Sequence, residues 1–177
     1  MHFELKSVSV QSIPEALAKV ERYRLLNEPH LAESICLDVL AVIPDHQQAL
    51  ISLLLARTDQ FQLKVNAKGA QEVLARIRGD YEREYYAGII WERMGHARIR
   101  QGGAGAGQGA AAYHALRSAM EHYEAASKLS APGNDGALLR WNTCARVIMQ
   151  NPNIRPSPSD QTEAWTRDDA SSRIADA

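Results

Sequence analysis

The sequence predicts an all-α protein, because three observations agree. Apolar residues recur every three or four positions along most of the chain, and only a helix places that spacing on one face. Proline, aspartate or glycine interrupts these periodic stretches at short intervals, as at Pro44 and Asp45. No stretch alternates apolar and polar residues for long enough to indicate a sheet. We therefore expect short connections between antiparallel helices.

The 177 residues are 45% hydrophobic, which suits one domain with a sizeable core but not two domains. We expect this domain at residues 12–150. Residues 1–11 alternate apolar and polar side chains too briefly for a sheet and are expected to form an N-terminal arm. Residues 151–177 combine prolines, serines and scattered acids, so we expect a disordered C-terminal tail.

The first helices are justified by their start and stop signals. Ser12 and Pro14 indicate the start of the first helix, with the serine near the cap. Pro44 ends the second helix, because proline has no backbone donor and constrains the residue before it. Asp45 is then placed to cap the third helix. Seven helices are expected, at residues 12–27, 30–43, 47–58, 67–77, 81–100, 110–129 and 136–149.

Glycines concentrate at residues 102–109 and predict a flexible loop, within an insertion at about residues 101–118. Part of this stretch, Gly105 to Ala110, superficially fits a dinucleotide-binding fingerprint. It follows a helix and not a strand, however, so a plain insertion is favoured. Glu92 and His96 lie one helical turn apart, a pair that we interpret as a solvated surface contact. We expect no catalytic residues, metal or cofactor.

Composition also limits which partners and which cellular location we expect for the protein. A net charge of −1 argues against a nucleic-acid binder. Cys36 and Cys144 lie on apolar helical faces and form no CxxC pair, so a reduced, cytoplasmic protein is expected. The longest apolar run, at residues 49–56, is too short to span a membrane, and the N-terminus has no signal-peptide pattern.

The helical hairpins repeat along the chain. Units that start at Ile13, Gln47 and Tyr81 are 34 residues apart. At this period the chain resembles the tetratricopeptide repeat family, whose unit has the same length. The residues that carry the resemblance are small, aromatic and turn residues at matching positions: Tyr23, Ala32, Leu40 and Pro44 in the first unit, and Ala87, Gly88, Trp91, Gly95, Ala119, Tyr123 and Ala126 in the third. The middle unit departs from the pattern at Asn66 and Arg78.

The resemblance implies a right-handed superhelix of about three hairpins with a C-terminal capping helix at residues 136–149. It also implies a concave groove lined by the first helix of each hairpin. Carried over residue by residue, the lining positions are Leu17, Glu21, Arg24, Gln48, Ile51, Leu55, Tyr85, Ile89, Glu92, Leu139, Thr143 and Arg146. This floor is largely apolar, so we expect a helical or extended peptide segment of an unknown protein partner there.

The leading hypothesis is therefore a non-enzymatic adaptor that binds proteins, without nucleic-acid binding or membrane insertion. The alternative is a self-associating structural subunit, that is, a homo-oligomer in which the groove or an end of the stack packs against another copy. An enzyme ranks third. A further alternative is that the arm, the insertion or the tail covers the groove. Trp165, an aromatic residue among tail acids, is either a docking motif or an incidental residue.

Overall fold

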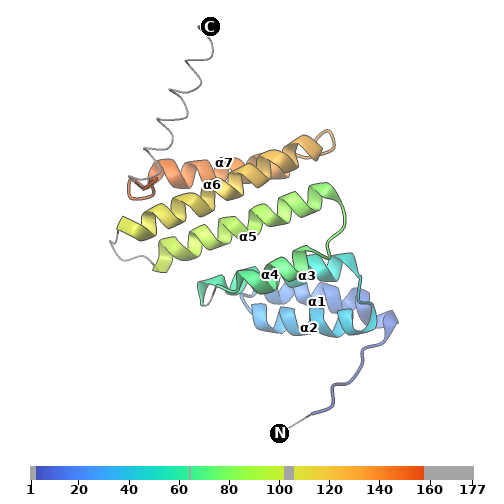
Figure 1. Ribbon diagram of the computed structural model, residues 1–177. Helices are drawn as coiled ribbons and strands as arrows, with labels where there is room; N and C mark the ends of the chain where they lie inside the picture. Colours follow the sequence, from blue (N-terminus) through green and yellow to red (C-terminus); the bar gives the residue numbers. More distant parts are fainter. Residues whose placement is uncertain (1–2, 64, 102–105, 158–177) are drawn as a thin grey trace, which may run out of the picture.

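The computed structural model describes residues 3–63, 65–101 and 106–157, and these ranges contain helices and no strand. The all-α class is thus confirmed (Figure 1). Seven α-helices follow one another within these ranges: α1 (Ile13–Leu25), α2 (Pro29–Val42), α3 (Gln47–Asp59), α4 (Ala67–Leu74), α5 (Asp80–Gln101), α6 (Ala106–Leu129) and α7 (Gly136–Gln150). Two short 3-10 turns, Val10–Ser12 and Gln60–Gln62, precede α1 and follow α3.

Local signals fix the helix ends, although not always through the expected residue. α2 ends at Val42, two residues before Pro44, as predicted. The cap of α3 is His46, whose Nδ1 accepts the N–H of Ala49 at 3.3 Å, and not Asp45. Ser12 precedes α1 but its hydroxyl donates to the carbonyl of Ser9 at 2.8 Å, so it provides no side-chain cap. These corrections concern single hydrogen bonds and leave the helices in place.

The second helix of the middle hairpin owes its start to a residue that departs from the repeat pattern. Asn66 caps α4 by accepting the N–H of Gly69 at 3.1 Å. α4 is shorter than expected and ends at Leu74, yet Ile77 beyond it is still only 2% exposed. The apolar pattern therefore identified the buried residues correctly but overestimated the length of the helix.

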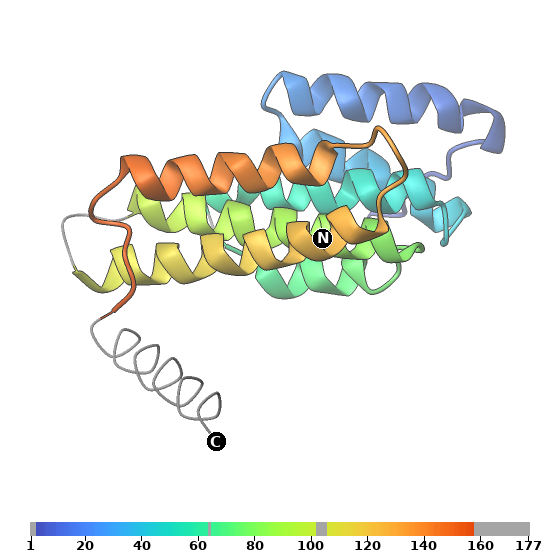
Figure 2. The same cartoon turned by 90° about the horizontal axis from the view of Figure 1, so that it is seen from above.

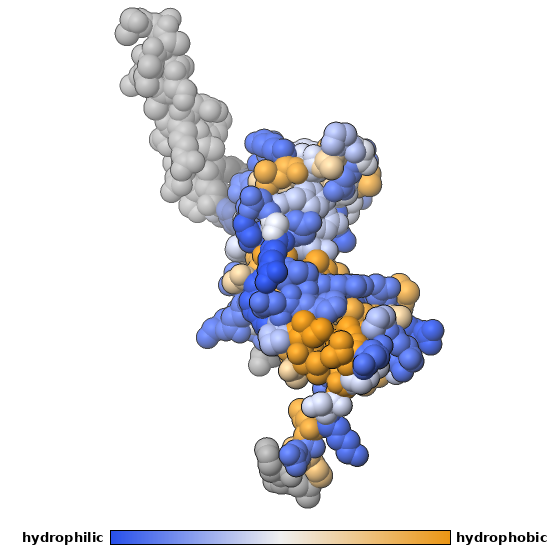
Figure 3. Space-filling view, turned by 90° about the vertical axis from the view of Figure 1, so that its right-hand side faces the viewer, coloured by the Kyte–Doolittle hydropathy of each residue, from blue (hydrophilic) through white to orange (hydrophobic). Residues whose placement is uncertain are grey.

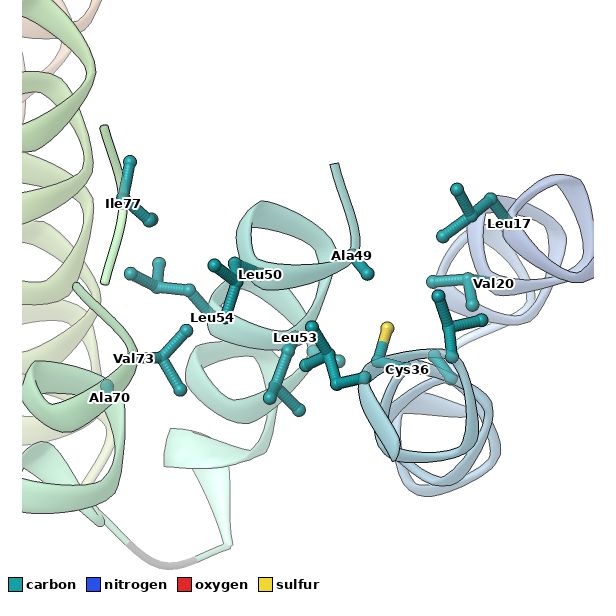
Figure 4. Close-up of a cluster of buried hydrophobic side chains, with 14 of the residues drawn as sticks. Leu17, Val20, Cys36, Ala49, Leu50, Leu53, Leu54, Ala70, Val73 and Ile77 are labelled. Atoms are coloured by element: carbon teal, nitrogen blue, oxygen red, sulfur yellow. The ribbon is translucent and has the colours of Figure 1, made fainter. Parts of the chain in front are cut away.

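Helices α1 to α4, together with Ile90 and Ala97 of α5, surround a first hydrophobic cluster (Figure 4). α1 contributes Leu17 and Val20, and α2 contributes Cys36. α3 crosses the middle of this cluster and is buried on most sides, with Leu50 and Leu54 fully enclosed. The short connections between these helices place each one against its neighbour, as expected for antiparallel hairpins.

Helices α5, α6 and α7 form a second cluster in which the two longest helices pack closely (Figures 1 and 2). Glycines allow the close approach. A Cβ atom on Gly88 would lie 2.5 Å from the ring of Tyr123, and one on Gly95 would lie 2.9 Å from Leu116. Leu55 of α3 and Tyr86 of α5 pack against both clusters and join them.

The expected insertion is largely helical. α6 begins at Ala106, so residues 106–109, which were expected in a flexible loop, belong to the first turn of a long helix. The physical reason is burial, because small residues of this helix such as Ala112 and Ala115 pack against the protein core and are at most 2% exposed. The remaining glycine-rich residues, 102–105, lie outside the described ranges.

Part of the segment that was expected to be a disordered tail packs against the helices. Ile154 is 7% exposed and belongs to the second cluster. A Cβ atom on Gly109 would lie 2.0 Å from the carbonyl oxygen of Asn153, so residues 151–157 lie directly on the first turns of α6. Residues 158–177 are outside the described part. In the arm, residues 3–9 have no regular structure, and Phe3 and Leu5 are exposed.

Successive hairpins pack against one another. α1 contacts α2 and α3, α3 contacts α4 and α5, α5 contacts α6, and α6 contacts α7. Because α1, α3 and α5 are the first helices of the three hairpins, these helices adjoin in sequence order. None of the helices within the described ranges is both long and apolar enough to cross a membrane.

Candidate functional site

A carboxylate of α3 ties together the first helices of the three hairpins. Asp59 accepts the Nε–H of Arg24, on α1, at 2.8 Å and lies 2.6 Å from a guanidinium nitrogen of Arg93, on α5. All three side chains are less than a quarter exposed. These ion pairs therefore hold α1, α3 and α5 in fixed positions relative to one another near Asp59.

Arg93 is anchored beyond its ion pair. The same guanidinium donates to the backbone carbonyl of Leu55 at 2.9 Å and to the hydroxyl of Thr58 at 2.6 Å. Burial lowers the pKa of Arg93, and the charge of Asp59 opposes this effect. A buried arginine with these partners positions helices, because its donors already have acceptors within the protein.

Apolar side chains of α3 lie beside this ion-pair cluster. Ile51 and Leu55 are half-buried, so each presents part of its surface to solvent, and Gln48 is exposed one turn before them. In Figure 3, apolar residues gather on the part of the molecule built from the first hairpins, next to a strongly hydrophilic band. This view shows one side of the molecule, and apolar surface is exposed there.

Tyrosines of α5 pack against one another and against α6. The rings of Tyr81 and Tyr85 are stacked with centroids 5.6 Å apart, and Tyr86 meets Tyr85 edge-on at 5.3 Å. Tyr85 also lies 5.8 Å from the ring of Tyr123 on α6. Burial raises the pKa of Tyr86, so this hydroxyl stays protonated at neutral pH. Tyrosines offer large rigid rings with a polar tip, a combination that is common at protein interfaces.

The twelve residues carried over from the repeat family differ widely in exposure. Buried residues cannot line an open surface, and this group comprises Leu17, Ile89 and Glu92. The half-buried group comprises Arg24, Ile51, Leu55 and Tyr85. The exposed group comprises Glu21, Gln48, Leu139, Thr143 and Arg146.

The α5 positions are enclosed for a specific reason. Ile89 packs in the second cluster with residues of α6 and α7, and Glu92 is bonded to both of these helices. Within the described ranges, these two positions are therefore enclosed mainly by α6 and α7, and Ile154 of the expected tail belongs to the same cluster. The accessible positions among the twelve lie on α1, α3 and α7, and Tyr85 of α5 is half-buried.

Glu92 is the centre of a buried polar network. The hydroxyl of Tyr123 donates to Glu92 Oε2 at 2.5 Å, and a guanidinium nitrogen of Arg140 lies 3.0 Å from both carboxylate oxygens. Arg140 also donates to the hydroxyl of Tyr85 at 3.3 Å. His96 Nε2 lies 3.8 Å from Glu92 Oε1. The interpretation of Glu92 and His96 as a solvated surface pair was wrong, because Glu92 is 5% exposed.

The network stabilises packing and does not resemble a catalytic centre. Burial and the neighbouring Glu92 carboxylate raise the pKa of Tyr123, so its hydroxyl remains a donor. Burial opposes the charge of Arg140, but the charge of Glu92, the influence of Tyr123 and the hydrogen bonds to Tyr85 and Glu92 together outweigh burial and raise the pKa of Arg140. Burial lowers the pKa of His96. Each group thus has a partner, and the network fixes α7 over the α5–α6 hairpin.

Sequence reasoning missed this network, although a signal was present. Glu92 falls three residues after Ile89 and three before Gly95, within the buried stripe of α5. An acid in such a stripe needs buried donors, because an isolated charge is costly there. Its partners lie far along the chain and could not be assigned from spacing. Within the described ranges, no group of three or more histidines, cysteines, aspartates or glutamates is arranged to hold a metal ion.

Comparisons with known proteins do not extend this description. No protein-family model matches the chain, and no curated protein or solved structure matches it significantly.

Proposed function

We propose that the chain is a non-enzymatic, tetratricopeptide-like module that binds a helical or extended segment of another protein. The proposed binding surface consists of Glu21 and Arg24 on α1 and Gln48, Ile51 and Leu55 on α3. The observation that carries the proposal is the side-by-side packing of α1, α3 and α5, tied by Asp59. Such packing presents a continuous surface along successive hairpins, as helical-repeat proteins use for binding.

The chemistry of this surface supports a peptide partner. Ile51 and Leu55 are partly exposed and provide apolar contact, while Gln48 and Glu21 provide polar contacts at the edge. An apolar strip with a polar rim is the usual anatomy of a protein interface. An amphipathic helix laid along α3 would bury its apolar face against the two aliphatic residues.

Site-specific photocrosslinking tests this proposal. A photoreactive amino acid is placed at Gln48, and in a second sample at Glu124, which is exposed on α6. Both substitutions are on helix surfaces, so the fold is retained in each. We expect a protein partner to be crosslinked from position 48 and not from position 124, and to be lost when Glu21→Lys is added. Crosslinking from both positions at equal yield would contradict a specific surface.

Self-association is the second candidate function, favoured by exposed leucines at both ends of the chain of helices. Leu25 ends α1 and Leu26 follows it, and they are 88% and 63% exposed. Leu138 and Leu139 of α7 are 49% and 63% exposed. Contact between two different surfaces of identical chains leads to head-to-tail assembly. Light scattering over a wide range of concentration tests this candidate, and a constant monomer mass would remove it.

A further inference from the structure

One end of the α5–α7 unit carries a concentration of positive charge. Arg98 and Arg100 lie in the last turns of α5, Arg146 lies near the end of α7, and Arg155 follows in the segment packed on α6. These helix ends lie together on the same side of the molecule in Figures 1 and 2. We call these four arginines the basic end.

The basic end has no compensating acids nearby in the sequence. Neither residues 93–120 nor residues 136–157 contain an aspartate or glutamate. All four arginines are exposed, and none forms an ion pair with another residue of the described part of the chain. Their charges therefore add and produce a local positive potential, although the whole chain has a net charge of −1.

The segment that follows has the opposite charge. Residues 158–177 contain Asp160, Glu163, Asp168, Asp169 and Asp176 against two arginines. Ile154 anchors the chain in the second cluster, so the described chain ends at Ser157 close to the basic end, and the acids follow Ser157 in the sequence. At about 3.5 Å per extended residue, the acids begin within roughly 10 Å of Ser157. A covalent link this short gives an effective concentration of about millimolar.

An apolar contact is also available at this end. Met149 is 74% exposed and follows Arg146 by three residues on α7, so the two side chains lie on neighbouring turns. In the acidic segment, Trp165 precedes Asp168 by three residues. The basic end therefore offers a methionine beside an arginine, and residues 158–177 contain a tryptophan close to an acid in the sequence. Sulfur makes favourable contacts with aromatic rings.

We propose that residues 160–169 bind the basic end of the same molecule, with their acids paired to the four arginines and Trp165 against Met149. This contact lies away from the surface of α1 and α3 that we propose for a protein partner. The proposed contact gives Trp165 a binding role that does not involve the surface of α1 and α3. The occupant of the basic end is thus the chain's own acidic segment.

Paramagnetic NMR on the full chain tests the contact. A nitroxide is attached to Ser171→Cys, and the reaction is selective because Cys36 and Cys144 are buried. At about 0.01 M salt we expect broadening of the amide signals of Arg98, Arg100, Arg146 and Arg155. At about 1 M salt, where the Debye length falls to about 3 Å, the broadening should weaken severalfold.

Two controls make the outcome decisive. Neutralising the acids by Asp160→Asn, Glu163→Gln, Asp168→Asn and Asp169→Asn should remove the broadening, and these positions lie outside the described ranges. A mixture of spin-labelled, unenriched chain with isotope-enriched, unlabelled chain should show no broadening. Broadening in that mixture would instead mean binding to a second copy. Broadening that persists in the neutralised variant, that centres on α1 and α3, or that is absent altogether would overturn the proposal.

Discussion

The hydroxyl of Tyr123 lies 2.5 Å from a carboxylate oxygen of Glu92, and both residues are buried between α5 and α6. This hydrogen bond joins residues 31 positions apart in the chain. Arg140 of α7 completes the charge balance from the other side. One acid therefore helps to hold three helices together, and its replacement tests how much the C-terminal part of the fold depends on it.

Glu92→Gln should destabilise the protein. The substitution removes the negative charge and leaves Arg140 partly buried without its counter-ion, so we expect the free energy of unfolding to fall by about 2 kcal/mol. Urea denaturation followed by circular dichroism measures the change. Glu124→Gln, on the exposed side of α6, is the matched control and should change stability by less than about 0.5 kcal/mol. Equal stability of the two variants would contradict the structural role of Glu92.

Two glycine-to-alanine substitutions should act in opposite directions. In Gly88→Ala the new Cβ atom would lie 2.5 Å from the buried ring of Tyr123, and we expect a loss of about 2 kcal/mol or more. In Gly107→Ala the new atom meets nothing within 4 Å, so better helix propensity should add up to about 0.5 kcal/mol. Thermal unfolding of both variants measures the difference. A neutral Gly88→Ala would show that α5 and α6 do not approach as closely as described.

Asp59→Asn should loosen α1 more than the distant helices. The change removes the acceptor shared by Arg24 and Arg93 and leaves Arg93 partly buried, so we expect about 1.5 kcal/mol of destabilisation. Hydrogen exchange measures where the effect falls. Amides of α1 should exchange faster, while those of α6 keep their protection. An equal increase in both helices would mean that Asp59 supports the whole fold and not this connection.

The two thiols should be inert in the folded protein. Burial raises the pKa of both Cys36 and Cys144 to about 12, against an ordinary value of 9.0. At pH 8 the thiolate fraction is then about a thousandfold lower than that of a free thiol. We expect a disulfide reagent to label neither cysteine until urea unfolds the chain. Rapid labelling of the native protein would contradict their burial.

The same pKa values predict a loss of stability in alkaline solution. The thiols of the unfolded chain ionise near pH 9, whereas those of the folded chain stay protonated to about pH 12. The stabilising contribution is fully present below pH 9 and is lost as the pH rises between these values. Urea midpoints at pH 8 and pH 10.5 measure this loss. Substituting both cysteines by alanine should reduce the difference between the two midpoints.

The sequence predicted the fold class and most helix boundaries because apolar spacing and proline signals are local. It did not predict that α6 begins at Ala106, because glycines disfavour a helix and nothing nearby in the sequence offsets them. The compensation is tertiary, since residues 151–157 pack directly on Gly109. The length of α4 was overestimated for a related reason, because Ile77 is buried without being part of the helix.

The candidate site was harder to predict than the fold. The repeat pattern identified which helices adjoin, but exposure depends on what packs over each position. Ile89 occupies a lining position and is nevertheless enclosed by α6 and α7. The ion pairs of Asp59 could not be predicted from spacing, because its partners Arg24 and Arg93 lie on two other helices. The repeat resemblance and the identity of a partner stay predictions.

Helix α5 takes part in both hydrophobic clusters, because Ile90 and Ala97 are buried in the first and Ile89 is buried in the second. Leu55 and Tyr86 pack against both clusters as well. A helix shared by two clusters couples their unfolding, so heating should melt the described helices in one cooperative step. A calorimetric enthalpy equal to the van't Hoff enthalpy would confirm this coupling, and two separate transitions would contradict it.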